Sequence, residues 1–423
     1  MKTFTFNFKK ITVIAFYLSI CISVNAQKDS SLFKRVQIDT SRQKLNMDGV
    51  YNKPFLTMGK MPVAVGGYME ANTQYSVTNG INADGFAFHF QRVSMFLESS
   101  IAKNIKFNSE IEYEDGGEDI EVEYAFMDLE LNPLLNFRGG IVLNPIGSFN
   151  ENHDGPRWDF IDRPISSTTI IPSTLSNAGF GFYGKYFFNN WIFAYETYLT
   201  NGFDDGIVSN ADGQTSLADG NQNPDKFEES NSGLPMFTGK IAIRNRKIGE
   251  FGISYLTDVY NEWKTDDGLI IAPKLSASIF ALDFSTSLLN DRFTITSEAA
   301  KVWVQLPPNT SENYGSQQDG GFIDFVGTVV KHKMLSWDNA KLELALRLEY
   351  ANYNIGSFSA TDEPIYDYIW AVVPGIAFRP VGSTVLRFNY VYSQQSDEAG
   401  GNFILGNVPV KTGTMEFGIS TYF

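Results

Sequence analysis

The sequence has little cysteine, little histidine and little charge. Its one cysteine is Cys21, and it has three histidines in 423 residues. Without Cys21, which lies in the segment that we expect to be removed on export, no disulfide, thiolate zinc site or cysteine nucleophile is possible. The 33 basic and 48 acidic side chains give a net charge of -15. This acidic balance argues against a nucleic-acid partner, because phosphate binding needs clustered lysine and arginine.

Long apolar runs are also scarce, and the mean hydropathy of -0.16 is too polar for a bundle of membrane helices. One such run, Ile11 to Val24, follows three lysines and precedes Val24-Asn25-Ala26. It is shorter than the roughly 20 apolar residues of a membrane helix. Residues 1–26 therefore read as a secretory signal peptide, with an N-terminal anchor helix as the alternative. A lipoprotein at Cys21 is disfavoured by the bulky Ile20 before it.

Alternation of apolar and polar residues dominates the rest of the chain and predicts β-strands. In 341–350, leucines and Tyr350 alternate with Lys341, Glu343, Arg347 and Glu349. In 119–131, Ile120, Val122, Tyr124 and Phe126 are expected to point away from Glu121 and Glu123. The predicted strands are 63–76, 85–100, 104–114, 119–131, 136–145, 179–188, 191–201, 236–245, 250–260, 272–288, 292–305, 321–332, 341–353, 366–379, 384–394 and 412–423. Broken alternation in 272–288 and 292–305 suggests a bulge there.

The connections between these segments alternate between short and long. Long ones are 146–178, 202–235, 261–271, 306–320, 354–365 and 395–411. Tight turns at one end and long loops at the other are typical of an outer-membrane barrel. In hydrocarbon every backbone donor and acceptor needs a partner, so a spanning sheet must close on itself. We therefore predict an all-β transmembrane antiparallel barrel of about 16 strands over residues 61–423. Residues 27–60 are interpreted as a periplasmic lead-in that could enter the periplasmic opening of the barrel.

The end of the chain supports export to the outer membrane of a Gram-negative cell. Counting back from Phe423, the alternate residues are Thr421, Ile419, Phe417 and Met415. An amphipathic last strand with a terminal aromatic residue resembles the signal that the barrel assembly machinery reads. The expected surroundings of such a barrel are outer-membrane lipid and lipopolysaccharide. A soluble secreted β-protein ending in an edge strand is the alternative.

The loop 146–178 is long, carries both signs of charge, and is expected to fold into the barrel and narrow it. Mixed charges at such a constriction would sort solutes by size and charge. A loop packed on the surface by internal salt bridges is the alternative. The candidate constriction residues are Glu151, His153, Asp154, Arg157, Asp159, Asp162 and Arg163.

Three stretches of the chain are characteristic: FHFQRVSMFLESSIAKNIKFNSEIEYE, FRGGIVLNPIGSFNENHDGPRWDFIDRP and GFGFYGKY. Together they resemble the phosphate-selective porin O and P family, in the branch common in Bacteroidetes-type outer membranes. The resemblance covers residues 61–423 and implies a 16-stranded homotrimeric porin for passive diffusion of small hydrophilic solutes or ions.

Phosphate selectivity does not follow from this resemblance, because it would need basic residues in excess of acids along the lumen. The predicted inward side chains are mixed in sign, which predicts weak charge selectivity. Those chosen as lumen-facing are Lys106, Glu110, Glu112, Glu121, Glu123, Arg138, Lys240, Arg244, Arg347 and Arg387.

Two other function classes stay open at this point. A barrel plugged by its own loops could bind a ligand rather than conduct. A hydrolase at the barrel mouth would need a histidine beside a nucleophile or an acid, for which His89 with Ser94 and His153 with Asp154 are the candidates. We expect no catalytic residues, no cofactor and no metal site. The acidic loop 202–235 could bind Ca²⁺, but a solvated loop is the simpler interpretation.

Overall fold

The structure is a computed structural model that describes residues 33–36, 45–58, 62–82, 85–223, 225–245, 247–266, 269–396 and 409–423. The predicted signal peptide 1–26 lies outside the described residues and stays a prediction. Among the described residues, no helix is long and apolar enough to cross a membrane, a finding that does not bear on β-barrels.

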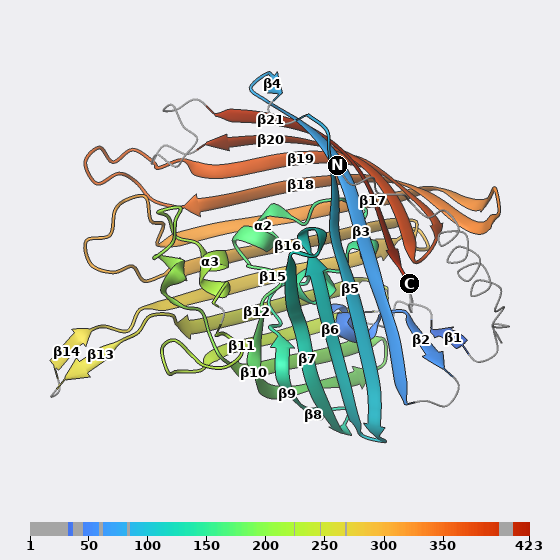
Figure 1. Cartoon of the computed structure of the whole chain (residues 1–423), viewed down its shortest axis with the longest axis horizontal. Coiled ribbons are helices and arrows are strands. Elements are labelled where there is room, and N and C mark those ends of the chain that lie inside the picture. The colour runs from blue at the N-terminus through green and yellow to red at the C-terminus, as the bar shows by residue number, and fades with distance from the viewer. Residues whose placement is uncertain are drawn as a thin grey trace, which may run out of the picture.

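Sixteen antiparallel strands form a closed barrel, as the alternation predicted (Figure 1). Closure is made by the last strand, which pairs with the first from Thr412 opposite Thr78 to Tyr422 opposite Tyr68. The strands are β3 (Val63–Thr78), β5 (Ala87–Ala102), β6 (Ile105–Glu114), β7 (Asp119–Asn132), β8 (Leu135–Leu143), β9 (Ser176–Phe188), β10 (Trp191–Thr200), β11 (Met236–Asn245), β12 (Gly249–Val259), β15 (Ser276–Leu288), β16 (Phe293–Val304), β17 (Gln317–Met334), β18 (Trp337–Asn354), β19 (Asp367–Val381), β20 (Thr384–Ser396) and β21 (Val410–Tyr422).

Smaller elements lie at the two ends of the barrel and inside it. The hairpin of β1 (Phe33–Val36) and β2 (Phe55–Met58) extends the sheet beside β3, near the C-terminus (Figure 1). The hairpin of β13 (Lys264–Asp266) and β14 (Leu269–Ala272) projects from the end that carries the long loops. The remaining elements are β4 (Ile81–Asn82), the short helices α2 (Ile165–Thr169) and α3 (Leu217–Asn221), and 3₁₀ turns at Asn46–Tyr51, Asp115–Gly117, Asn150–Asn152, Gly155–Arg157 and Asp205–Ile207.

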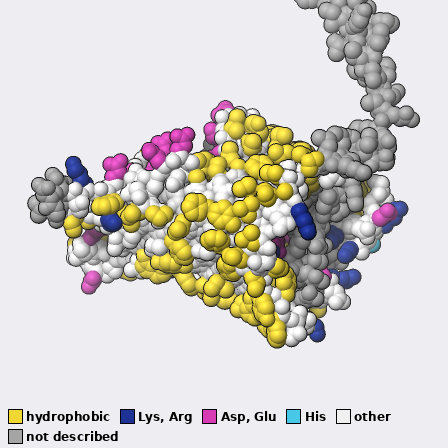
Figure 2. Space-filling view, turned by 90° about the horizontal axis from the view of Figure 1, so that it is seen from below, with side chains coloured by type: hydrophobic (Ala, Val, Ile, Leu, Met, Phe, Trp, Pro, Cys, Tyr) yellow, Lys and Arg dark blue, Asp and Glu magenta, His cyan; other side chains and the backbone are white. Residues whose placement is uncertain are grey.

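The two faces of the barrel wall differ in chemistry because side chains alternate along each strand. On β18, Leu344, Leu348 and Tyr350 are exposed on the outer face. On the same strand Arg347 is 1% exposed and Glu349 is 8% exposed on the inner face. Figure 2 shows a broad apolar surface with most charged side chains toward its ends. The outer face therefore suits lipid, and the charges face inward.

Two expectations about strand parity are wrong. In β7, Tyr124 and Phe126 are each 1% exposed and lie on the inner face, because the pairing with β6 shifts between Glu110 and Ile111 and places a bulge at Glu123. Conversely, the pairing of β15 with β16 is continuous from Ala277 to Leu288 and needs no bulge. The segment 272–275 broke the pattern because it precedes the strand.

Candidate functional site in the barrel lumen

Two chain segments fill the middle of the barrel. One is the connection 144–175 between β8 and β9, called loop 3 because it is the third connection at the long-loop end. The other is residues 45–54, called the N-terminal segment, which runs inside the wall before β2. Side chains of both segments are buried. The exposed fraction is 3% or less for Ile146, Phe149 and His153 of loop 3, and for Met47 and Val50 of the N-terminal segment.

Loop 3 is anchored to the far wall mainly through its backbone. The Glu298 carboxylate of β16 accepts the N–H groups of Ser148 (2.6 Å) and Phe149 (2.9 Å), and it also accepts the Ser167 hydroxyl (2.7 Å). Apolar residues of the loop, including Ile146 and Ile170, pack into the largest buried cluster of the protein. A carboxylate that receives several N–H groups in a dry site holds the loop firmly.

Arginines on three neighbouring strands hold the tip of loop 3. Arg379 of β19 contacts Asp159 at 2.7 Å and donates to the carbonyl of Pro156 at 2.7 Å. Arg387 of β20 donates to two carbonyls of the tip, at Gly155 (3.1 Å) and Phe160 (2.5 Å). Arg347 of β18 donates to the Asp162 carbonyl at 2.9 Å. These guanidinium groups are therefore engaged in structure rather than presented to a solute.

The N-terminal segment is held to the barrel wall mainly by its side chains. Asp48 pairs with Lys185 of β9, and Tyr51 donates to Asp128 of β7. The N–H of Asn46 donates to Glu250 of β12 at 2.9 Å. Leu45 and Met47 pack against Ile192 and Ala194 of β10 and Ala242 of β11. This segment therefore contacts several strands of the wall, through an ion pair, hydrogen bonds and a small apolar cluster.

Lys53 is the most buried charge of the N-terminal segment. Its ammonium contacts Glu110 of β6 and lies 2.9 Å from Oδ1 of Asp154 in loop 3. It also lies 4.0 Å from the centre of the Phe96 ring, a cation–π contact. Burial would lower the pKa of Lys53, but the carboxylates of Asp154 and Glu110 raise it well above its usual range. The lysine therefore stays charged and joins the segment to both the wall and loop 3.

The two segments also contact each other directly. Arg157 of loop 3 donates to the carbonyls of Gly49 (2.7 Å) and Asn52 (2.8 Å). Asn152 donates to the Asn46 carbonyl at 3.0 Å. Loop 3 and the N-terminal segment thus form one packed unit inside the barrel.

His153 lies at the centre of this unit, next to the acids around Lys53. Its Nδ1 is 2.8 Å from the Asn150 carbonyl, and its Nε2 lies 4.0 Å from Glu110 and 3.9 Å from Asp154. Burial lowers the pKa of His153 to about 4, against the smaller opposing effect of Asp154. The imidazole is therefore neutral at neutral pH.

The structure places all seven predicted constriction residues inside the barrel, but mostly paired rather than facing open water. Glu151 and Lys240 of β11 are 3.6 Å apart, and Arg163 is 3.8 Å from Glu112. Lys240 in turn lies 3.1 Å from Asp283 of β15. Asp162 differs, because it lines a hollow at the loop end.

The ten residues chosen as lumen-facing lie on the inner face of the wall. Arg138 pairs with Asp128 at 2.9 Å, and Arg244 pairs with Glu250 at 3.0 Å. Lys106 contacts Glu130 at 2.7 Å in a half-exposed position. Glu121 is exposed beyond the packed zone, whereas the neighbouring Glu123 is buried. Among the described residues, most charges of the midsection are therefore buried against loop 3 and the N-terminal segment.

Open space lies at the two ends of the lumen. Near the short turns, a hollow of about 620 Å³ is lined by Lys106, Glu130, Lys185 and Asp48; we call it the turn-end vestibule. Near the long loops, a hollow of about 420 Å³ is lined by Asn72, His89, Gln91 and Asp162; we call it the loop-end vestibule. Charges of both signs line the first, and mainly neutral polar groups and acids line the second.

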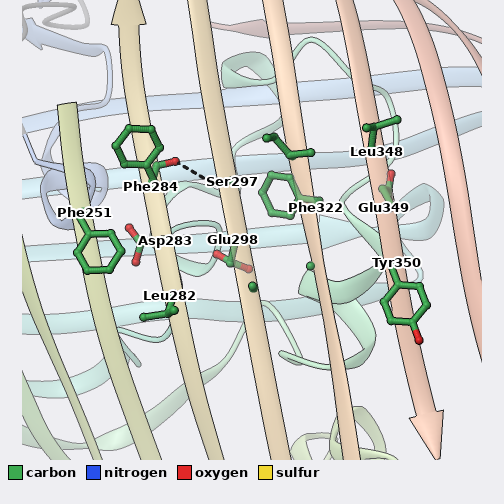
Figure 3. Close-up of a pocket in the computed structure, with 13 residues that line it drawn as sticks. Phe251, Leu282, Asp283, Phe284, Ser297, Glu298, Phe322, Leu348, Glu349 and Tyr350 are labelled. Carbon is green, nitrogen blue, oxygen red and sulfur yellow. Dashed lines mark hydrogen bonds between the residues drawn. The ribbon is translucent and has the colours of Figure 1, made fainter. Parts of the chain in front are cut away.

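A third hollow, of about 460 Å³, lies on the outer wall across β12 and β15 to β18 (Figure 3). Its exposed lining includes Phe251, Leu282 and Tyr350, whereas Asp283 and Glu298 behind it belong to the buried inner face. Small residues such as Gly321 make the wall thin there. This apolar depression is part of the lipid-facing surface.

One of the two candidate hydrolase pairs forms in part. His89 and Ser94 lie five positions apart on β5, and the Ser94 hydroxyl donates to Glu110 rather than to a histidine. His153 does lie beside Asp154, with Nε2 3.9 Å from Oδ1, but no hydroxyl contacts this nitrogen among the described residues. In loop 201–235, Phe203 and Leu217 pack into the buried core, and the described acids of this loop do not gather as a cation site.

Sequence reasoning missed the residues of the N-terminal segment and the wall arginine Arg379. The stretch Asn46 to Pro54 has no sustained period, so strand patterning could not place it. A usable signal was its composition, since Met47, Val50 and Tyr51 are apolar or aromatic residues in an otherwise polar lead-in. Such residues need a buried surface.

Comparison with known proteins supports the fold. A comparison with protein-family models finds no match. An uncharacterized protein of Aquifex aeolicus is 26% identical over 363 residues, covering 80% of this chain and 77% of that protein. Pseudomonas putida OprB superposes with a TM-score of 0.51 at 8% identity, covering 86% of this chain and 94% of that one. The outer membrane channel DcaP of Acinetobacter baumannii gives 0.50 at 12% identity, covering 85% and 97%. The fold is thus that of a transmembrane barrel found in outer-membrane channels.

Proposed function

We propose that this protein is an outer-membrane porin for passive diffusion of small hydrophilic solutes or ions, with weak charge selectivity. The observation that carries the proposal is a closed barrel of 16 strands with loop 3 inside it and a vestibule at each end. Barrels of this strand number are wide enough for an aqueous channel unless chain fills them. We take the long-loop end as extracellular and the turn end as periplasmic.

Loop 3 and the N-terminal segment together form the constriction in this proposal. A solute would enter the loop-end vestibule beside Asp162 and leave through the turn-end vestibule beside Lys106. The turn-end vestibule has two lysines facing three acids, at Asp48, Glu98 and Glu130. Such a mixed lining favours neither ion strongly, which supports weak selectivity rather than a phosphate-specific path.

A barrel plugged for ligand binding is the second candidate, and the burial of the midsection favours it. In that case the loop-end vestibule would hold the ligand, and transport would need another component. The homotrimer implied by the family resemblance, the contact with lipopolysaccharide and assembly through the strand ending at Phe423 also stay proposals.

Single-channel recording of the refolded protein in a planar bilayer tests the function. A porin predicts steady steps of conductance and a reversal potential near zero, or mildly cation-selective, under a salt gradient. Steps in groups of three would support the trimer. Folded barrels that never conduct, at any voltage tested, would reject the channel and favour the plugged binding barrel. A strongly anion-selective reversal potential would reject weak selectivity.

A further inference from the structure

The surroundings of the Lys53 ammonium have the chemistry of a metal site. Glu110 of β6 and His153 and Asp154 of loop 3 point at one small volume inside the barrel. All four side chains, Lys53 included, are at most 1% exposed. The lysine is the cation there, in contact with Glu110 and 2.9 Å from Asp154 Oδ1. A tethered ammonium thus occupies the position of a free cation.

The state of His153 supplies an independent indication of a ligand. Its Nδ1 lies 2.8 Å from the Asn150 carbonyl, which can only accept, so Nδ1 carries the hydrogen. In the neutral ring Nε2 then has a free lone pair. This buried nitrogen has no hydrogen-bond partner among the described residues, and the carboxylate oxygens nearest to it are acceptors as well. An unsatisfied buried acceptor among acceptors is costly, and a cation would satisfy all of them.

We infer that Glu110, His153 and Asp154 form a binding site for a divalent first-row metal cation, which competes with the Lys53 ammonium. Metal-binding imidazoles commonly donate their other N–H to a backbone carbonyl, as His153 does to Asn150. Glu112 offers a further carboxylate beside the site, because ligand atoms of Glu110, Glu112 and His153 all lie within 4.8 Å of one another. Zinc binds nitrogen and carboxylate ligands at ~2.0–2.2 Å, so two ligands of one ion can be up to ~4.2 Å apart.

The separations of 3.9 and 4.0 Å from Nε2 to the two carboxylates fall inside that limit. One imidazole with carboxylates suits Zn²⁺ or a neighbouring ion better than Ca²⁺, which takes six to eight oxygens. The other oxygen of Asp154 accepts the Tyr422 hydroxyl at 2.7 Å, so Oδ1 is the one that faces the site. Glu112 forms an ion pair with Arg92 at 2.7 Å, so it is a ligand only if that pair breaks.

Competition follows from the geometry, because a metal ion and the ammonium cannot share one buried position. Metal binding would release Lys53 and remove the most buried ion pair of the N-terminal segment. This inference concerns binding and does not depend on whether the barrel conducts. Its failure is therefore distinguishable from failure of the proposed function.

Calorimetric titration of the folded, detergent-solubilised protein with Zn²⁺ tests the site. Lys53→Met removes the ammonium and keeps an apolar stem, so we expect one Zn²⁺ to bind at least ~10-fold more tightly than to the wild type. Adding His153→Gln to this variant should return the affinity to the wild-type value. Lys185→Met removes another lysine that holds the same segment and should leave Zn²⁺ affinity unchanged. No gain in Lys53→Met, or an equal gain without His153, would overturn the inference.

A measurement on the unaltered chain covers the case in which Lys53→Met does not fold. Lys53 is buried and should react slowly with a water-soluble amine reagent. Saturating Zn²⁺ should increase its labelling, as read by mass spectrometry, in the wild type but not in His153→Gln, and saturating Ca²⁺ should not. Labelling of Lys53 that Zn²⁺ leaves unchanged in the wild type would overturn the inference.

Discussion

Loop 3 and the N-terminal segment fill the same lumen but are held in different ways. Loop 3 is continuous with a wall strand on both sides and is fixed through its backbone to Glu298, Arg379 and Arg387. It also contributes to the largest apolar cluster. The N-terminal segment leads directly into β2 and is held to the wall through the side chains of Asp48, Tyr51 and Lys53. Loop 3 is therefore fixed by its connections to two strands and by backbone contacts, whereas charged side chains attach the N-terminal segment to the wall.

The N-terminal segment is the insert that can be displaced more easily. Backbone contacts spread over many residues resist any single change, whereas an ion-paired segment depends on the charge state of a few groups. Salt, acid or a competing cation should therefore act on the N-terminal segment before they act on loop 3.

Deletion of residues 45–54 should have the largest effect. It removes one of the two inserts without touching the described strands, so the channel should widen. Single-channel conductance should rise by roughly threefold or more, because a barrel of this size is closed only by what fills it. An unchanged conductance in a correctly folded deletion variant would show that loop 3 alone sets the constriction.

Lys53→Met should destabilise the packed unit by about 3–5 kcal/mol, since it leaves Glu110 and Asp154 buried without their cation. We expect frequent transient openings in bilayer recordings and a lower temperature for the heat-dependent gel shift. The matched control is Lys185→Met, whose pair with Asp48 is partly exposed and should cost at most about 1 kcal/mol. Equal effects of the two variants would contradict the special role of Lys53.

Mild acid should loosen the contact between the two inserts. His153 is neutral when packed, with its pKa lowered to about 4 by burial, against about 6.5 when it is free. A histidine with a lowered pKa in the folded state contributes stability that is fully present above pH 6.5 and is lost as the pH falls toward 4. For His153 this loss in the free energy of unfolding is at most about 3 kcal/mol. The charged groups facing His153 are Asp154, Lys53, Arg163, Glu112 and Glu110.

Channel openings should therefore become more frequent between pH 6.5 and 4 in the wild type. Burial would raise the pKa of Asp154, but Lys53 and Arg157 hold it well below its usual range, so that carboxylate stays charged in this window. His153→Gln has no group that titrates at this position and should flatten the response. A response of the same size in His153→Gln would assign it to another group.

Glu298→Gln should have the smallest effect of the four. Gln keeps an acceptor for the N–H groups of Ser148 and Phe149 but loses the charge, which should cost about 1–2 kcal/mol. The other contacts of loop 3 should keep it in place, so conductance should change little. A conductance gain as large as that of the deletion would show that loop 3 is the loosely held insert.

The fold was predictable because apolar and polar side chains alternate along each strand, with one face toward lipid and the other toward the lumen. All sixteen predicted strands correspond to strands of the barrel, with shifted ends. Parity was lost where a bulge intervened, as at Glu123, since a single extra residue moves Tyr124 and Phe126 to the inner face. The position of a bulge depends on pairing with the neighbouring strand, which local periodicity does not contain.

The site was less predictable than the fold. The length and mixed charge of loop 3 predicted that it folds into the lumen, but the residues that it contacts come from strands distant in sequence. Glu298 and Arg379, which hold loop 3, are more than a hundred residues away from it. The N-terminal segment has no strand or helix period, so nothing local predicts that Lys53 meets Glu110 and Asp154. Packing inside the barrel decides these contacts.

The most direct test of the filled lumen is the reactivity of a single cysteine at Ser94, a buried inner-face position on β5. Ser94→Cys would be treated with a water-soluble thiol reagent in the full chain and in the chain lacking 45–54, with exposed Asn104→Cys as the control. We predict slow labelling of Ser94→Cys in the full chain and labelling faster by on the order of tenfold after the deletion. Fast labelling in the full chain, or slow labelling in both, would contradict a lumen filled by a removable N-terminal segment.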